Sequence, residues 1–237
     1  MTERTPHTHS TGTGVPDSSA QDHSGQDAPR TDPLQQPTVT RLANGRQVPI
    51  PRQKRPGPYR VPPRAQRHGL LIVNTGDGKG KTTAALGVLL RAYGRGMEVG
   101  MYQFVKRLTN TGEHRVARRL GVVMEALGAG CTGARSVTDT DIARARAGWQ
   151  RVQGVLAEGR YDVLILDELT LPMTWGWLDE QEVVEALRGR AQGTHVIVTG
   201  RHAPEALVAA ADLVTDMRVI KHPYRSEGLK AQGGIDV

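Results

Sequence analysis

Cysteine and long apolar runs are scarce in this chain of 237 residues. The single cysteine, Cys131, excludes an internal disulfide and a cysteine-ligated metal cluster. No apolar run approaches the about 18 residues that a membrane-spanning helix needs. The first ten residues also lack the apolar segment of a signal peptide. We therefore expect a cytoplasmic protein.

Residues 1–67 lack the apolar periodicity of a folded segment. They hold 11 of the 14 prolines and are rich in Ser, Thr, Gln, Asp and His. Such a segment cannot bury enough surface to offset the entropy lost on ordering. We predict that residues 1–67 are a disordered tail and that residues 68–237 form one domain, since 170 residues suffice for one α/β core.

The net charge of +7 is concentrated in this tail. Residues 1–67 contribute +5 and the remaining residues +2, and residues 41–67 hold eight basic side chains and no acidic one. A basic arm suits nucleic acid or an acidic partner, or it keeps a tail without a fixed partner in solution. Prolines rather than aromatic residues separate the charges, so we do not expect nucleic-acid binding.

The most informative stretch is LLIVNTGDGKGKTT at residues 70–83. Its first four residues predict a buried strand, and the glycine-rich turn after them runs directly into helical spacing. Glycines let backbone N–H groups converge on phosphate oxygens in front of a helix N-terminus. We predict that a nucleoside triphosphate binds to the residues of this phosphate loop, which are Thr75, Gly76, Asp77, Gly78, Lys79, Gly80, Lys81, Thr82 and Thr83.

Two side chains of the phosphate loop have predicted roles. Lys81 reaches the phosphates, and the Thr82 hydroxyl binds Mg²⁺ (or Mn²⁺). The consensus G-x-x-x-x-G-K-[ST] is matched at its Gly-Lys-Thr end, but Thr75 stands at the first glycine position and Gly76 follows one place later. The alternative interpretation is a glycine-rich turn with a chance Gly-Lys-Thr.

A second strand pattern, YDVLIL at residues 161–166, contains the apolar run VLIL and is followed by Asp167 and Glu168. A continuous apolar run fits a strand that is covered on both faces of a parallel sheet. Asp167 then lies at the carboxyl end of a strand, where ligands of open α/β sheets bind. In this Walker B pattern Asp167 holds the metal ion, and Glu168 orients a water or completes the metal shell. Apolar runs that end in Asp-Glu also arise by chance.

Strand patterns alternate with helical patterns along residues 68–237. Helical spacing is present at residues 81–93, 139–158, 180–190 and 203–211, and the last strand is predicted at residues 213–220. This order predicts the α/β class, with a P-loop NTPase-like (RecA-like), mostly parallel sheet and helices on both faces. The fold alone does not identify a reaction.

Six blocks in order resemble the ATP:corrinoid adenosyltransferases over about residues 68–237. They are the phosphate loop, QFVK at 103–106 with GE at 112–113, LDELT at 166–170, TGR at 199–201, VIKH at 219–222, and KAQGGID at 230–236. This family transfers the 5′-deoxyadenosyl group of ATP to Co(I) of a corrinoid and releases triphosphate. The corrinoid is cob(I)yrinic acid a,c-diamide, cobinamide or cobalamin, and the step belongs to adenosylcobalamin biosynthesis.

The resemblance implies roles for the candidate catalytic residues Lys81, Arg201 and Glu168. Lys81 stabilises the triphosphate leaving group. Arg201 binds phosphate or the acidic and amide rim of the corrinoid, or else it is a surface arginine. Glu168 supports Mg²⁺, because a Co(I) nucleophile loses no proton and needs no general base. ATP is then the co-substrate, the cobalt belongs to the substrate, and the implied partners are a flavin reductant protein and a second copy in a homodimer.

One block departs from the family pattern. Before the long helix the family has Gly-Phe-Thr-Trp, whose aromatic residues cover the lower face of the corrin ring, whereas this chain has GCTG at 130–133. Both aromatic positions are small, Cys131 and Gly133. We therefore expect a preference for corrinoids without a nucleotide base when reduction starts from Co(II). Trp175 and Trp177 either cover the corrin face instead or pack as ordinary core residues.

Two other functions stay open from the sequence. One is a P-loop NTPase of other specificity, which would release phosphate or ADP. The other is a non-catalytic paralogue that binds ATP or a corrinoid for delivery or regulation.

Overall fold

The computed structural model describes residues 39–41, 47–49, 61–107, 110–128, 130 and 137–235. The described residues belong to one compact unit that begins at Thr38. Val39–Arg41 (β1) and Gln47–Pro49 (β2) pair as a short antiparallel sheet. No helix in the described part of the chain combines the length and apolar content of a membrane span.

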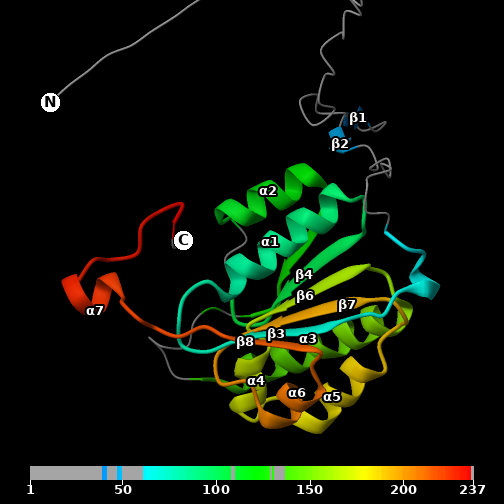
Figure 1. Cartoon of the computed structure of the whole chain (residues 1–237). Helices are drawn as coiled ribbons and strands as arrows, with labels where there is room; N and C mark the ends of the chain where they lie inside the picture. Colours follow the sequence, from blue (N-terminus) through cyan, green and yellow to red (C-terminus); the bar gives the residue numbers. More distant parts are fainter. Residues whose placement is uncertain are drawn as a thin grey trace, which may run out of the picture. The chain divides into compact units, whose positions relative to one another are not determined.

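Six parallel strands form the main sheet in the order β5-β4-β6-β7-β3-β8 (Figure 1). Their bounds are Leu71–Thr75 (β3), Val99–Gln103 (β4), Val123–Ala126 (β5), Val163–Asp167 (β6), His195–Thr199 (β7) and Leu213–Asp216 (β8). Parallel neighbours need crossover connections, and helices supply them. The strand that precedes the phosphate loop, β3, is separated from β6 by β7. The predicted parallel sheet is confirmed.

Helices cover both faces of this sheet (Figure 1). One face carries Lys81–Gly94 (α1) and Gly112–Leu120 (α2). The other face carries Asp139–Glu158 (α3), Thr170–Thr174 (α4), Glu180–Arg188 (α5) and Glu205–Ala210 (α6). A short 3-10 turn, Arg64–Gln66 (η2), precedes β3, and Pro223–Glu227 (α7) follows β8.

The side chains of the central strands alternate between these two layers. In β6, Leu164 and Leu166 pack in the core between the sheet and helices α3 and α5. Val163 and Ile165 pack on the other face, against α1. All four are buried, and each such side chain contributes about 1.5–3 kcal/mol relative to an exposed one. Burial on both faces explains why the sequence of this strand is continuously apolar.

The helix ends follow their capping residues, whereas one strand is shorter than predicted. Thr138 caps α3 in a capping box with Asp141, so the helix spans the predicted residues 139–158. The last strand was predicted to reach residue 220 but ends at Asp216. Its partner β3 ends at Thr75, where the chain turns into the phosphate loop, so the regular strand pairing stops there, although Met217 still bonds to Thr75 and Gly78.

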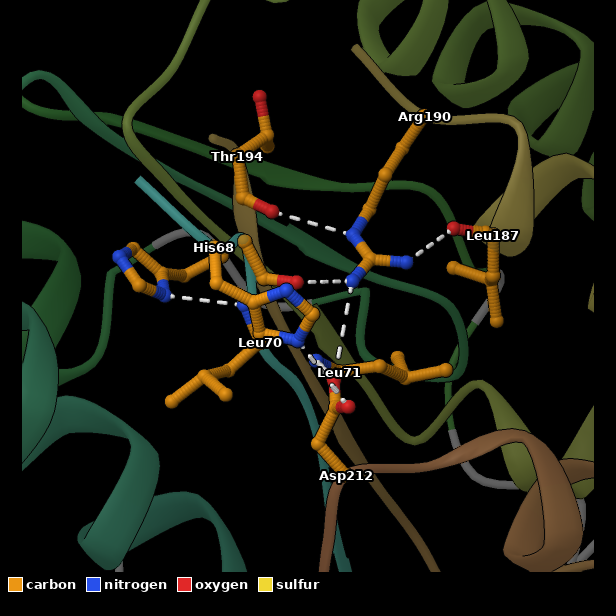
Figure 2. Close-up of polar contacts among 9 residues, drawn as sticks. His68, Leu70, Leu71, Leu187, Arg190, Thr194 and Asp212 are labelled. Carbon is orange, nitrogen blue, oxygen red and sulfur yellow. Dashed lines mark hydrogen bonds and ion pairs between the residues drawn. The ribbon is translucent and has the colours of Figure 1, made fainter. Parts of the chain in front are cut away.

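Arg190 fixes the amino ends of several strands, as Figure 2 shows. Its guanidinium group donates hydrogen bonds to three backbone carbonyl groups, those of Leu187, Thr194 and Gly69. It also lies 3.9 Å from the Asp212 carboxylate, which accepts a hydrogen bond of 2.7 Å from the Leu71 N–H group. The start of β3 is therefore tied to the chain before β7 and before β8.

The folded part begins before the predicted boundary at residue 68. Arg64 and Arg67 both donate to Oδ1 of Asp162, at 3.1 and 2.8 Å, and Asp162 is buried at the amino end of β6. These two residues stand in the segment predicted to be disordered, and an ion pair with a carboxylate about 100 positions away orders them. For the tail residues outside the described ranges, disorder stays a prediction.

The contacts of Asp162 also shift the pKa of its carboxyl group. Burial raises its pKa, but the hydrogen bond from the Glu98 N–H group and the guanidinium groups of Arg67 and Arg64 outweigh burial, so the pKa of Asp162 lies below its ordinary value. A carboxylate with a depressed folded pKa stabilises the protein above its unfolded pKa, and this stabilisation is lost as the pH falls through the folded pKa.

We predict that Asp162→Asn lowers the free energy of unfolding at pH 7 by about 1.5–3 kcal/mol, because it removes charge-assisted hydrogen bonds from a buried site. The difference from the wild type should shrink below about pH 4, where the carboxylate is protonated in the unfolded chain. Urea denaturation from pH 7 to pH 3 measures this, with the exposed Glu158→Gln as control. A difference that stays constant over this range would contradict the assignment.

Candidate functional site

The predicted site residues meet at the carboxyl edge of the sheet. The phosphate loop follows β3, Asp167 ends β6, and Arg201 lies two residues beyond β7. These strands are parallel, so their carboxyl ends share one edge. The structure thus brings together the phosphate loop and the predicted residues Asp167, Glu168 and Arg201.

The glycines of the phosphate loop are required by the close approach of the last residue of β8 and the residue after it. The Gly78 N–H group donates to the Met217 carbonyl oxygen at 2.6 Å. A Cβ atom on Gly76 would lie 2.2 Å from an Asp216 carboxylate oxygen, and one on Gly78 would lie 2.6 Å from the Met217 carbonyl oxygen. Gly76 also has φ +94°. Thr75 is still part of β3, so the loop needs its first glycine one position later than the consensus has it.

Lys81 is buried inside the phosphate loop with 6% exposure. Its ammonium group donates to the carbonyl oxygens of Gly76 at 2.5 Å and of Gly78 at 2.7 Å. Burial, and after it the nearby charge of Arg201, lower the pKa of Lys81. The remaining predicted loop residues lie on its outer side, where Asp77, Lys79 and Thr83 are exposed.

Asp167 is fully buried and is held by four donors, one from α1, one from the end of each of β4 and β7, and one from the loop after β4. Its Oδ1 accepts hydrogen bonds from the Thr82 hydroxyl at 2.8 Å and from the Thr199 hydroxyl at 2.7 Å. Its Oδ2 accepts one from Gln103 Nε2 at 3.0 Å and lies 3.3 Å from Lys106 Nζ. A buried carboxylate is tolerated only with such partners, so they fix its position closely.

Backbone strain marks the ends of β6 and β7. Among the described residues, Glu168 and His202 are the two non-glycine residues with positive φ, at 59° and 50°. The Glu168 N–H group donates to the Thr199 hydroxyl at 3.0 Å, and that hydroxyl donates onward to Asp167. Burial, followed by the adjacent Asp167 charge, raises the pKa of Glu168. Strain of this kind persists where the surrounding structure enforces it, commonly at functional sites.

Arg201 has a fixed backbone and an accessible guanidinium group. A Cβ atom on Gly200, which has φ +145°, would lie 2.0 Å from the Thr170 hydroxyl, and this hydroxyl donates to the Arg201 carbonyl oxygen at 2.6 Å. The guanidinium group pairs with Asp77 of the phosphate loop at 2.9 Å, and both side chains are about half exposed. Arg201 therefore faces the loop and is free to exchange one anionic partner for another.

A pocket of about 560 Å³ opens beside the phosphate loop. It is bounded by the start of the loop, by the turn after β7 and by the chain after β8, and its lining includes Thr75, Gly76, Asp77, His202, Asp216, Arg218 and Arg225. The lining combines loop backbone, the basic side chains of Arg218 and Arg225, and two carboxylates, of which Asp216 pairs with Arg218 at 3.2 Å.

The oxygen atoms around Asp167 fit a hard divalent cation. The Thr82 hydroxyl and an Asp167 oxygen lie 2.8 Å apart, and the buried Oε1 of Gln103 has no hydrogen-bond partner. Across the described ranges, no group of three His, Cys, Asp or Glu side chains could hold a metal ion together. A site with one carboxylate, one hydroxyl and the phosphates of a ligand is the arrangement in which Mg²⁺ binds, rather than a cage of protein side chains.

Sequence reasoning assigned no role to Gln103, Lys106 or Thr199, although each stood in a block that resembled the family. Gln103 and Thr199 are the last residues of β4 and β7, the two strands that flank β6. The signal in the sequence was a polar residue at the end of an apolar strand, which places its side chain at the ligand-binding edge of the sheet.

Lys221 and His222 make contacts within and next to α7. Lys221 pairs with Glu227, and the His222 ring accepts a hydrogen bond from the Tyr224 N–H group.

The substituted loop, with Cys131 and Gly133, lies outside the described residues. The rings of Trp175 and Trp177 contact each other with centroids 4.7 Å apart, and Trp175 is 40% exposed. Trp177 lines a groove of about 720 Å³ with Trp149 and Met173. These tryptophans are thus not wholly core residues, and a role for them over a corrin ring stays a prediction.

Comparisons with known proteins identify the family of this chain. The family model for ATP:corrinoid adenosyltransferase BtuR/CobO/CobP matches residues 67–237. A corrinoid adenosyltransferase from Sinorhizobium sp is 40% identical over 172 residues, which are 71% of this chain and 80% of that protein. One from Escherichia coli (strain K12) is 39% identical and covers 75% of this chain and 90% of that protein. Among solved structures, the flagellar accessory protein FlaH from Methanocaldococcus jannaschii aligns with a TM-score of 0.42 and 14% identity over 63% of this chain and 71% of that one.

We predict that Thr199→Val weakens the binding of ATP with Mg²⁺ by about 10- to 100-fold, because the hydroxyl orients Asp167 and accepts from the Glu168 backbone. Thr194→Val is a matched control, since it removes a buried hydroxyl at the other end of the same strand, where Thr194 donates to the Tyr161 carbonyl oxygen at 3.3 Å. Calorimetric titration of both variants gives the comparison. Equal dissociation constants for the two would count against a role of Thr199 in the site.

Proposed function

The chain belongs to the ATP:corrinoid adenosyltransferase family, and from this premise we propose how its site carries out the reaction. The enzyme transfers the 5′-deoxyadenosyl group of ATP to Co(I) of a corrinoid and releases triphosphate, in adenosylcobalamin biosynthesis. The observation that most strongly supports a site for ATP with a metal ion is the 2.8 Å hydrogen bond from Thr82 of the phosphate loop to Asp167 at the end of β6.

The chemistry of the transfer is a displacement at carbon. The electron pair of Co(I) attacks C5′ of ATP, a Co–C bond forms, the C5′–O bond breaks, and its electron pair leaves with the triphosphate. No proton is transferred, so the site needs no general base. Its task is to place the two reactants in line and to stabilise the charge that develops on the leaving oxygen.

Lys81 and Arg201 are the cations that we assign to the triphosphate. The loop holds the Lys81 ammonium group between two carbonyl oxygens, so it is already positioned for a phosphate. Arg201 reaches the other side of the loop through Asp77 and can pass from that carboxylate to a phosphate oxygen. Each charge-assisted contact of this kind contributes about 1.5–3 kcal/mol.

Thr82 and Asp167 are the residues that would hold Mg²⁺ or Mn²⁺. A bound Mg²⁺ neutralises charge on the phosphate oxygens. Glu168 lies next to Asp167 on a strained turn, and burial raises its pKa. In our proposal Glu168 accepts hydrogen bonds from water around the cation, since the transfer itself offers it no proton to accept.

We also propose the partners that complete this reaction. Co(I) requires a strong one-electron reductant, and a reduced flavin protein is the class that the family resemblance implies. A homodimer is supported by β8, an edge strand whose four residues are exposed, among them Leu213 and Val214.

ATP as co-substrate favours a cytoplasmic location. A preference for corrinoids without a nucleotide base follows from the small residues at Cys131 and Gly133.

A P-loop NTPase is the second candidate, because Glu168 beside a buried Asp167 also resembles an arrangement that activates water. The product separates the two functions. Incubation with ATP, Mg²⁺ and chemically reduced cobalamin or cobinamide should yield adenosylated corrinoid and intact triphosphate. ADP or free phosphate as the main product would contradict the transferase assignment.

We predict that Lys81→Ala lowers kcat/KM in this assay by at least about 100-fold, since a preorganised cation is lost from the leaving group. Lys221→Ala is the matched control, because in the described part of the chain Lys221 is exposed and pairs with Glu227 of α7. Near-normal turnover of Lys81→Ala, with an unchanged melting temperature, would mean that the triphosphate binds elsewhere.

A further inference from the structure

Lys106 lies between two carboxylates that belong to different parts of the site. Its Nζ is 3.3 Å from Asp167 Oδ2 at the end of β6 and 3.9 Å from Glu113 Oε1 in the first turn of α2. Asp167 is fully buried, whereas the Lys106 side chain is about one-third exposed. Within the described part of the chain, Lys106 is the cation that pairs with Asp167, and neither the loop lysine Lys81 nor Arg201 takes this place.

We propose that Lys106 is an internal counter-ion that competes with the divalent cation for Asp167 and moves to Glu113 when the cation binds. The inference rests on the proposed role of Asp167 as a cation ligand. It adds a positioning residue to the reaction, and it makes cation binding an exchange of one positive charge for another at a buried carboxylate.

The exchange follows from the cost of a buried charge. Asp167 without a cation would leave a carboxylate uncompensated in the interior, which is strongly unfavourable. An ammonium group and a divalent cation on the same carboxylate would repel each other at a few ångströms, where water screens them poorly. The two cations therefore exclude one another, and the buried Asp167 carboxylate has a cationic partner in either state.

Glu113 supplies the second position for the ammonium group. Its carboxylate is already within 4 Å of Lys106, so rotation of the flexible lysine side chain suffices for the transfer. Glu113 stands in the first turn of α2, where the helix dipole favours a negative charge. The neighbouring His114 does not compete with Lys106 for the Glu113 carboxylate, because burial lowers the pKa of His114 and disfavours its charged form.

Gln103 prepares the position that Lys106 would vacate. Its Nε2 donates to the same Asp167 oxygen that Lys106 contacts, which fixes the orientation of the amide. Its Oε1 then points elsewhere as a buried acceptor with no partner. An acceptor of this kind suits a water molecule of a hydrated cation better than it suits an ammonium group that already has two carboxylates.

The test uses Mn²⁺ alone as the probe and the full chain, with free Mn²⁺ followed by electron paramagnetic resonance. We expect Lys106→Met to bind Mn²⁺ at least about tenfold more tightly than the wild type, because the competing charge is gone. The metal-free variant should melt at a lower temperature than the wild type, and Mn²⁺ should raise its melting temperature more. Lys221→Met removes an exposed, paired lysine and should change neither quantity.

A second arm tests the exchange itself. Glu113→Gln should weaken Mn²⁺ binding several-fold in the wild-type background, since Lys106 then has no second carboxylate, and should have no effect when combined with Lys106→Met. A wild-type dissociation constant that Lys106→Met leaves unchanged or raises would overturn the inference while the proposed function stands. Failure of both proteins to bind Mn²⁺, whether it is supplied alone or together with ATP, would contradict the cation site, and with it the role proposed for Asp167.

Discussion

The buried carboxylate of Asp167 is the constraint on which the carboxyl edge of this protein depends. Four groups hold it: two hydroxyls, one amide and one ammonium group, from three different segments of the chain. A buried charge costs several kcal/mol unless its partners are all in place. Each of these segments is therefore held in register by the same group that, in our proposal, meets the cation.

The order of the strands makes this convergence possible. β6 lies between β4 and β7, so Gln103 and Thr199 reach Asp167 from either side. β3 is one strand further away, and Thr82 crosses that distance because the phosphate loop turns the chain into α1 above the edge. At the opposite end of the strands, two ion pairs, Arg190 with Asp212 and Arg67 with Asp162, tie the amino ends together. One end of the sheet is thus fastened by ion pairs, and the other end supports the chemistry.

Local patterns predicted most of this architecture. The apolar run and glycine turn at residues 70–83, the run that ends in Asp167, and the bounds of α3 all follow from periodicity and capping. These features depend on residues close together in the sequence. The predicted grouping of the phosphate loop with Asp167 and Arg201 followed from the rule that parallel strands end at one edge.

What the sequence left unassigned depends on contacts between distant segments. No periodic pattern reveals that β4 and β7 flank β6, so the roles of Gln103 and Thr199 could not be derived. Arg64 and Arg67 are ordered because they pair with Asp162, far along the chain. Their local sequence resembles the rest of the basic tail, so it does not reveal this contact. β8 ends early because β3 leaves the sheet, which is a property of the partner strand and not of β8 itself.

The central claim, that the carboxylate which holds this edge together is also a cation ligand, is tested most directly by Asp167→Asn. The amide keeps the shape of the carboxylate but removes its charge. Our account predicts that this variant still folds but loses binding of Mn²⁺ with ATP and loses adenosyl transfer, while its metal-free melting temperature falls because Lys106 loses a buried counter-ion. Wild-type Mn²⁺ affinity and turnover in Asp167→Asn would contradict the account.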